Sequence, residues 1–361
     1  MITESLKKKI DRGREGKNQG LSIGLEKLES IIDGVTQSTY TLIYSGTGCG
    51  KTTLALFSYI YYPLKYHLED GLYRASIFSL EMDADILYAK LMLLYLYDTY
   101  GIDLSVKELL SRKKNFILTD ELYDIVQKGF EWLDKVEKVV TIYDGNCNAG
   151  FVYKCIMEEL KARGTFTDVG KRKIYTPDNP DLTHIVMIDH MSLLRPSEGR
   201  NLKGEIDETS AYLVTLRNKC GISPLVIMQI NRDSSSMDRR KANLNNLTLN
   251  DIKDSGNPAQ DCEVALSLFN PLREELATYH GYNIKELRDR FRSITVRKTR
   301  YDEAEVEIGC FFWGHNGYFK ELPKSDEIFD YTRYKKLDFD KEEDKEEIVE
   351  ESSTSNFNFT M

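Results

Sequence analysis

Residues 39–62 read TYTLIYSGTGCGKTTLALFSYIYY. The β-branched and aromatic run at 39–44 predicts a strand, and the segment from Lys51 to about Tyr62 predicts a helix. Glycines in the turn between them let backbone N–H groups converge on phosphate groups at the positive end of the helix. In such a loop Lys51 reaches the β- and γ-phosphate oxygens, and the Thr52 hydroxyl ligates Mg²⁺. A plain glycine-rich turn is the alternative, since Ser45 stands where the pattern expects glycine. The predicted nucleotide contacts are Ser45, Gly46, Thr47, Gly48, Cys49, Gly50, Lys51, Thr52 and Thr53.

Outside this segment, apolar runs alternate with stretches that are long enough for helices. Strands that alternate with helices indicate an α/β fold with a mainly parallel sheet flanked by helices. The residues between 98 and 137 are expected to be helical with short loops. The runs that predict further strands are 74–80, 139–143, 184–188, 224–229, 264–269 and 294–298.

Composition divides the chain into three parts. Residues 1–19 are polar and net positive and predict a basic arm, whereas residues 20–330 have the pattern of one ATPase domain with an insertion near 164–181. Residues 337–361 contain nine acids and two lysines and have the composition of a disordered tail. The net charge of −9 therefore resides mostly in the tail, and a nucleic-acid partner is not excluded.

Two classes of protein are excluded by composition. The chain has no run of 18 apolar residues that could span a bilayer, and its basic start is not followed by the apolar segment of a secretory signal. The six cysteines lie far apart without a CxxC pair, so we expect free thiols rather than a zinc site or a disulfide framework.

Two carboxylates at predicted strand ends have the positions that hydrolysis requires. Asp189 follows the run 184–188 and is expected to hold the hydrated Mg²⁺, although an acid after an apolar run is often structural. His190 stands where many such ATPases have the water-activating glutamate, so the general base must come from elsewhere. His190 itself is expected to pack or to form a hydrogen bond at the strand end. Glu81, at the end of 74–80, is the best candidate because it would face the γ-phosphate across the strand ends. The alternative for Glu81 is an acid that only stabilises the start of the next helix.

Polar and basic groups follow several other predicted strands. Gln229 ends a strand, where a neutral amide can sense the γ-phosphate. Lys298 and Arg300 alternate at another strand end and would point the same way, as a pair that reaches a nucleotide would. Plain charges on a surface hairpin are the equally open alternative. Basic residues in two loops suit contacts to a phosphate backbone, and a solvated surface is the equally open alternative. The predicted DNA contacts are Arg200, Lys203, Arg239, Arg240 and Lys241.

These motifs in this order resemble the hexameric replicative DNA helicases of the DnaB family, within the RecA-like ATPases. The segments GLSIGLEKL (20–28), SGTGCGKTT (45–53), FSLEM (78–82), IDHMSLL (188–194), MQINR (228–232), the element from Asp251 to Leu268, and KTR (298–300) carry the resemblance. His190 and Ser192 depart from the family pattern, and the family's N-terminal helical domain has no counterpart before residue 20.

The resemblance implies an ATP- and Mg²⁺-dependent DNA helicase that assembles as a homo-oligomeric ring, a hexamer in the family. It implies translocation along single-stranded DNA with 5′→3′ polarity, unwinding at the replication fork, and a primase or loader as partner. It also implies a cytoplasmic protein of a bacterial cell or an infected host, without a membrane partner. The alternatives are a RecA-like recombinase or loader, and a KaiC-like ATP-driven regulatory scaffold.

Removal of residues 337–361 is expected to leave ATP hydrolysis and oligomer size unchanged. The segment is highly charged and has few apolar residues, so it cannot contribute to a core. Hydrolysis rates and light scattering of a chain that ends at residue 336 would measure both properties. A truncated chain that fails to fold or to assemble would show that the tail is structural.

Overall fold

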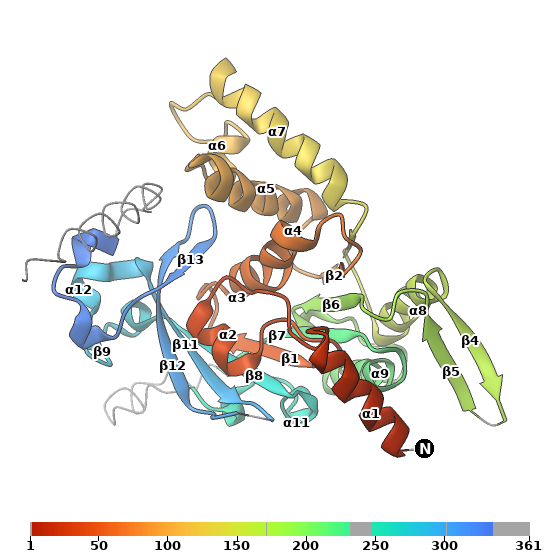
Figure 1. Cartoon of the computed structure of the whole chain (residues 1–361). Helices are drawn as coiled ribbons and strands as arrows, with labels where there is room; N and C mark the ends of the chain where they lie inside the picture. The colour runs from red at the N-terminus through yellow and green to blue at the C-terminus, as the bar shows by residue number, and fades with distance from the viewer. Residues whose placement is uncertain (1, 171, 232–246, 301, 335–361) are drawn as a thin grey trace, which may run out of the picture.

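The computed structural model describes residues 2–170, 172–231, 247–300 and 302–334. These residues form a nine-stranded sheet with the strand order β13-β12-β11-β8-β1-β7-β6-β2-β3. Helices flank the sheet on both faces (Figure 1). The predicted α/β fold with a mainly parallel sheet is therefore confirmed.

Six neighbouring strands of the sheet are parallel. At its centre β1 (Thr41–Ser45) lies between β7 (Ser223–Gln229) and β8 (Val264–Phe269). All five residues of β1 are buried, as expected for a parallel strand that helices cover on both faces. The remaining parallel strands are β6 (Thr183–Asp189), β2 (Tyr73–Ser79) and β3 (Val140–Asp144).

The other edge of the sheet is antiparallel. The strand predicted at 294–298 is β11 (Phe291–Lys298), and it runs opposite to β8 without a crossover helix between them. Two strands that the sequence analysis missed, β12 (Val306–Trp313) and β13 (Tyr318–Glu321), continue the sheet. The connection from β8 to β11 contains only short elements. These are two 3₁₀ helices, η5 (Pro271–Glu274) and η6 (Arg288–Arg290), the strands β9 (Thr278–Tyr279) and β10 (Tyr282–Asn283), and the helix α12 (Ile284–Leu287).

One face of the sheet is covered by helices from the first half of the chain, whose apolar side chains form one core cluster with Ile43, Met187 and Ile227. The helical segment that follows β1 continues through a π-helical stretch, Leu56–Tyr61, to His67 and so extends past its predicted end at Tyr62. The helices on this face are α2 (Glu26–Ile32), α3 (Lys51–Ala55), α4 (Tyr62–His67), α5 (Ala84–Tyr100) and α7 (Asp120–Val136).

The opposite face packs against a second cluster that contains Leu42, Phe78 and Val226. Strand residues with adjacent numbers point to opposite faces, so β1 supplies Leu42 to this cluster and Ile43 to the other. The helices on this face are α8 (Ala149–Lys161) and α9 (Leu202–Cys220), together with the short α11 (Asn257–Asp261).

Side-chain caps define where several helices begin. Thr119 Oγ1 accepts a hydrogen bond from Leu122 N at 3.3 Å, and the long helix α7 starts immediately after it. Residues 98–137, expected to be helical with short loops, contain the end of α5, the short α6 (Val106–Leu109) and α7, with a longer connection at 110–119. Asn148 and Asn201 cap α8 and α9 in the same way.

The predicted insertion is a β-hairpin, β4 (Gly164–Val169) and β5 (Arg172–Pro177), that projects from the body of the molecule (Figure 1). The basic arm contains α1 (Ile2–Arg14), whose Arg12 pairs with Asp181 beside the hairpin. None of the helices in the described ranges combines the length and apolar surface that a bilayer crossing requires. The six cysteines carry free thiols, as expected.

A buried polar network joins β2, β6 and α8. Arg74 Nε donates to Glu159 Oε2 at 2.9 Å, and Ser76 Oγ donates to the other oxygen of that carboxylate at 2.8 Å. His184 Nε2 lies 2.8 Å from Ser76 Oγ, and because the serine hydrogen is used by Glu159, the ring donates to the serine. Burial lowers the pKa of His184 to about 4, which leaves the ring neutral at physiological pH.

The unfolded chain therefore binds a proton at His184 more tightly than the folded chain does. Stability should fall as the pH drops from about 6.5 toward 4, because the unfolded histidine gains a proton that the buried ring excludes. Between pH 7 and pH 5 the free energy of unfolding is expected to fall by about 1–2 kcal/mol from this group. Urea unfolding at both pH values measures the change, and His184→Gln should reduce the pH dependence. An equal pH dependence in the variant would contradict this assignment.

Candidate nucleotide-binding site

The glycine-rich turn connects the end of β1 to the start of α3. Gly48 and Gly50 have φ angles of 70° and 105°, a region that residues with a Cβ rarely adopt. Lys51 Nζ donates to the carbonyl oxygens of Ser45 and Gly46 at 3.1 and 3.0 Å. Burial lowers the pKa of Lys51. The ammonium is thus held at the mouth of the turn, where a phosphate group would replace the carbonyl contacts with an ionic one.

Thr52 and Asp189 meet across the ends of neighbouring elements. Thr52 Oγ1 donates to Asp189 Oδ2 at 2.6 Å, and the Asp189 side chain is almost fully buried. Burial raises the pKa of Asp189 to about 6, and its second oxygen, Oδ1, has no hydrogen-bond partner among the described residues. A hydroxyl and an unpaired buried carboxylate oxygen are ligands that Mg²⁺ prefers, so these two residues fit the predicted metal.

Glu81, His190 and Gln229 form a row beside this pair. Glu81 lies just after β2 with its side chain 55% exposed, whereas the His190 side chain is only 5% exposed. His190 Nε2 lies 3.8 Å from Glu81 Oε2 and 3.0 Å from Gln229 Nε2. Burial also lowers the pKa of His190. The candidate base and the candidate sensor amide are therefore joined through a histidine for which sequence analysis expected only packing or hydrogen bonding.

A cavity of about 700 Å³ contains most of these groups. Glu81, Asp189 and Gln229 line it, together with six of the nine predicted nucleotide contacts. The six are Thr47, Gly48, Gly50, Lys51, Thr52 and Thr53, whereas Ser45, Gly46 and Cys49 lie outside the lining. A larger groove of about 900 Å³ between α4, α5 and α7 contains none of the predicted site residues.

Several cavity residues were missed by sequence analysis because they come from α5 and from the antiparallel edge strands. Arg292 is buried, donates from Nε to Cys49 O at 2.7 Å, and lies 4.6 Å from the centroid of the Phe312 ring. Arg292 therefore holds the glycine-rich turn in place through its hydrogen bond to Cys49 O. Lys90, on α5, brings a second ammonium into the cavity near Asp189. The other missed lining residues are Met82, Asp289, Arg290, Trp313, Gly314 and His315.

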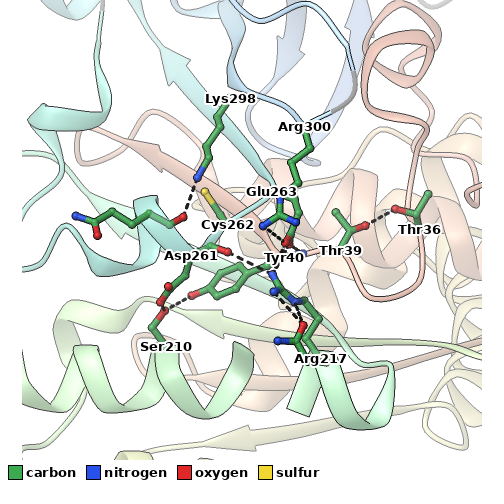
Figure 2. A network of polar contacts seen from close by, with 12 residues as sticks. Thr36, Thr39, Tyr40, Ser210, Arg217, Asp261, Cys262, Glu263, Lys298 and Arg300 are labelled. Atoms are coloured by element: carbon green, nitrogen blue, oxygen red, sulfur yellow. Dashed lines mark hydrogen bonds and ion pairs between the residues drawn. The ribbon is translucent and has the colours of Figure 1, made fainter. Parts of the chain in front are cut away.

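Lys298 and Arg300 do not lie at this cavity. Figure 2 shows both side chains pointing toward the segment that joins α11 to β8. Lys298 Nζ donates to Ala259 O and Gln260 O at 2.9 Å, and Arg300 Nη2 lies 3.1 Å from Glu263 Oε1. Because β11 is antiparallel to β8, the end of β11 lies beside the amino-terminal ends of β8 and β1. The glycine-rich turn follows the carboxyl end of β1, so the length of β1, about 13 Å at about 3.3 Å per residue, separates the two.

The predicted DNA contacts are only partly described. Arg200 lies just before α9, and its Nη2 donates to Glu208 Oε1 at 3.0 Å. Lys203 is exposed in the first turn of α9. The remaining predicted contacts, Arg239, Arg240 and Lys241, lie outside the described residues.

Comparison with known proteins supports the resemblance. No protein-family model matches the chain. Its sequence is 25% identical over 251 residues to "Replicative DNA helicase DnaB" of two strains of Helicobacter pylori, covering 69% of this chain and 43–44% of the relatives. The chain thus spans less than half the length of the curated relatives it matches.

Solved structures share the fold. A solved ATPase domain matches with a TM-score of 0.67 at 17% identity, covering 90% of this chain and 99% of that one. A DnaB-like replicative helicase, from a structural study that also describes its interactions with primase, matches with a TM-score of 0.63 at 16% identity. The match covers 84% of this chain and 64% of that one. A KaiC-like protein of Pyrococcus horikoshii matches with a TM-score of 0.50 at 17% identity, covering 84% and 99%. The predicted RecA-like fold and the resemblance to DnaB helicases are therefore confirmed.

Two substitutions should separate nucleotide binding from hydrolysis. Lys51→Ala removes the cation at the turn and is expected to abolish hydrolysis, while Glu81→Gln should bind nucleotide normally and lose about 10²–10⁴-fold in rate. Titration with a fluorescent ATP analogue and steady-state hydrolysis with DNA present measure the two effects. If Glu81→Gln hydrolyses ATP at nearly the normal rate, another group is the base.

Proposed function

We propose that this protein is an ATP-dependent replicative DNA helicase that works as a ring, of six copies by analogy with the DnaB family. It translocates 5′→3′ along single-stranded DNA and unwinds duplex at the replication fork. The observation that carries the proposal is the separation of two half-sites in one chain. The phosphate-binding turn lies at the carboxyl ends of the parallel strands, and the Lys298–Arg300 pair lies at their amino-terminal ends.

In this proposal each residue of the cavity has a defined task. Lys51 binds the β- and γ-phosphates, and Glu81 accepts a proton from the attacking water. Thr52 and Asp189 would hold Mg²⁺, which supplies charge to the phosphate oxygens when it is bound. Gln229 contacts the γ-phosphate or its water through its side-chain amide. Burial of Lys51 and Asp189 strengthens the electrostatic contacts of these two residues relative to water.

The positions of the two half-sites support a ring. Arg300 cannot reach the phosphates bound by its own chain, because the length of β1 lies between them. If a neighbouring copy packs its glycine-rich turn against the end of the sheet that carries Arg300, the guanidinium would reach the γ-phosphate of the nucleotide bound by that copy. The Arg300 side chain is 52% exposed, so one face of the guanidinium is available while Glu263 holds another. Lys298 would assist from the same strand end.

Single-stranded DNA and partner proteins enter the proposal on different grounds. Arg200, Lys203 and the basic residues 239–241 would contact DNA phosphates without reading base sequence. A primase or a loader is proposed as a partner because the primase interaction is described for a DnaB-like helicase of the same fold. The KaiC-like fold match keeps an ATP-driven scaffold as the second candidate, with a lower TM-score than the other two solved structures.

Mixtures of two inactive variants test whether the site is shared. Arg300→Ala should bind ATP almost normally and hydrolyse it roughly 10³–10⁵-fold more slowly, as when an arginine finger is removed. Lys51→Ala retains the finger but not the phosphate site. In mixed rings, some interfaces combine an intact Lys51 with an intact Arg300, so part of the hydrolysis should return.

The control is a mixture of Arg300→Ala with Arg300→Lys, in which no interface contains an arginine at this position. Retention of an untagged variant by an affinity-tagged variant in each mixture verifies that rings containing both variants form. If mixed rings form and hydrolysis does not return at any ratio, Arg300 does not act across an interface.

A further inference from the structure

His190 fills the space between the candidate base and the candidate sensor. It follows Asp189 at the end of β6, and its ring is held under the surface with a side-chain exposure of 5%. Its Nε2 atom faces both neighbours, at 3.0 Å from Gln229 Nε2 and 3.8 Å from Glu81 Oε2. Its other ring nitrogen, Nδ1, has no hydrogen-bond partner among the described residues. The polar contacts of this ring are thus concentrated on one atom.

The chemistry of the two neighbours makes their contacts with this atom exclusive. An amide nitrogen can only donate, so Nε2 accepts when it contacts Gln229 Nε2. An ionised carboxylate can only accept, so a hydrogen bond to Glu81 requires that Nε2 carries the hydrogen. One nitrogen cannot satisfy both neighbours at once. With Gln229 donating to the ring, the Glu81 carboxylate is left available for a water molecule.

The backbone at the end of β7 is hydrogen-bonded to a second segment, residues 251–253. Gln229 O accepts a hydrogen bond from Lys253 N at 2.9 Å, and Asn231 N donates to Asp251 O at 2.8 Å. The chain continues from this segment into α11, whose last carbonyl groups hold Lys298. Backbone hydrogen bonds and the continuous chain therefore connect Gln229 to the residues that hold Lys298 at the opposite end of the strands.

We propose that His190 is a positioning residue that holds the Gln229 amide beside the Glu81 carboxylate and so couples water activation to the end of β7. This inference rests on the proposed function, because it takes Glu81 as the base. His190 does not contact the nucleotide itself. It acts by placing Gln229 and Glu81, and by pairing with only one of these two side chains at a time.

Three substitutions distinguish positioning from space filling. Glutamine can place its amide oxygen near the position of His190 Nε2, so His190→Gln can still accept the hydrogen bond from the Gln229 amide. Asparagine is shorter and can reach only the position of Nδ1. Leucine fills a similar volume without any polar atom and leaves the Gln229 amide without this partner.

The experiment measures steady-state ATP hydrolysis by the full chain with Mg²⁺, with and without an oligo(dT) strand. His190→Leu is expected to lower kcat about tenfold with KM changed less than about twofold, and His190→Gln to keep kcat within about threefold of the unsubstituted chain. His190→Leu should also reduce the ratio of DNA-stimulated to basal hydrolysis. Equal kcat values for His190→Leu and the unsubstituted chain would overturn the inference. So would a His190→Gln variant as slow as His190→Leu while both bind a fluorescent ADP analogue normally.

A double-mutant cycle with Gln229→Ala provides an independent measure. If His190 acts through Gln229, the double variant should be no slower than the slower single variant, whereas independent effects would multiply. Multiplied effects would overturn the inference. If His190→Leu fails to fold, as judged by its melting temperature, His190→Asn replaces it in the same comparison.

The outcomes separate this inference from the proposed function. A chain whose hydrolysis does not respond to oligo(dT) contradicts the helicase proposal, yet the kcat values of the three variants still decide the role of His190. A chain that responds normally to oligo(dT) with His190→Leu in place contradicts only the role of His190.

Discussion

The parallel register of β1, β7, β6 and β2 is the constraint on which the rest of the structure depends. Because these strands run in the same direction, their carboxyl ends lie side by side at one end of the sheet. The glycine-rich turn, Gln229, Asp189 and Glu81 follow those four ends and meet at one cavity. The antiparallel strand β11 starts at this end of the sheet and finishes at the opposite end, which places Lys298 and Arg300 far from the cavity. One sheet thus places the cavity residues at one end of its strands and the Lys298–Arg300 pair at the other.

Lys51 and Asp189 place two buried ionisable groups of opposite sign beside the cavity. Water is largely excluded from Lys51 and Asp189, and burial lowers the pKa of the first and raises that of the second. Each group is then less stable in its charged form than it would be in water. A triphosphate with its cation would place opposite charges beside both groups and so stabilise their ionised forms. The carbonyl contacts of Lys51 and the Thr52 contact of Asp189 hold these side chains in place beforehand.

The sequence predicted the glycine-rich turn, the parallel strands and the acids at their ends, because these features are local in the chain. It did not predict β12 and β13, or the residues that they and α5 bring to the cavity, such as Arg292, Phe312 and Lys90. Their contribution depends on which strands pair, and pairing across long separations has no local signal. The pairing of Arg300 with Glu263 and the place of His190 between Glu81 and Gln229 were missed for the same reason. The roles assigned to the site residues, and the domain limits 1–19, 20–330 and 337–361, stay predictions.

Directional unwinding tests the central claim, that two half-sites of one sheet combine between copies into a DNA motor. Labelled duplexes that carry a single-stranded tail at only the 5′ end, at only the 3′ end, or at both ends of a fork would be incubated with the protein, ATP and Mg²⁺. The account predicts strand separation that requires a 5′ tail, is abolished by Lys51→Ala and by Arg300→Ala, and accompanies ring formation in electron micrographs. Strand exchange on filaments, or ATP hydrolysis without any strand separation, would contradict it.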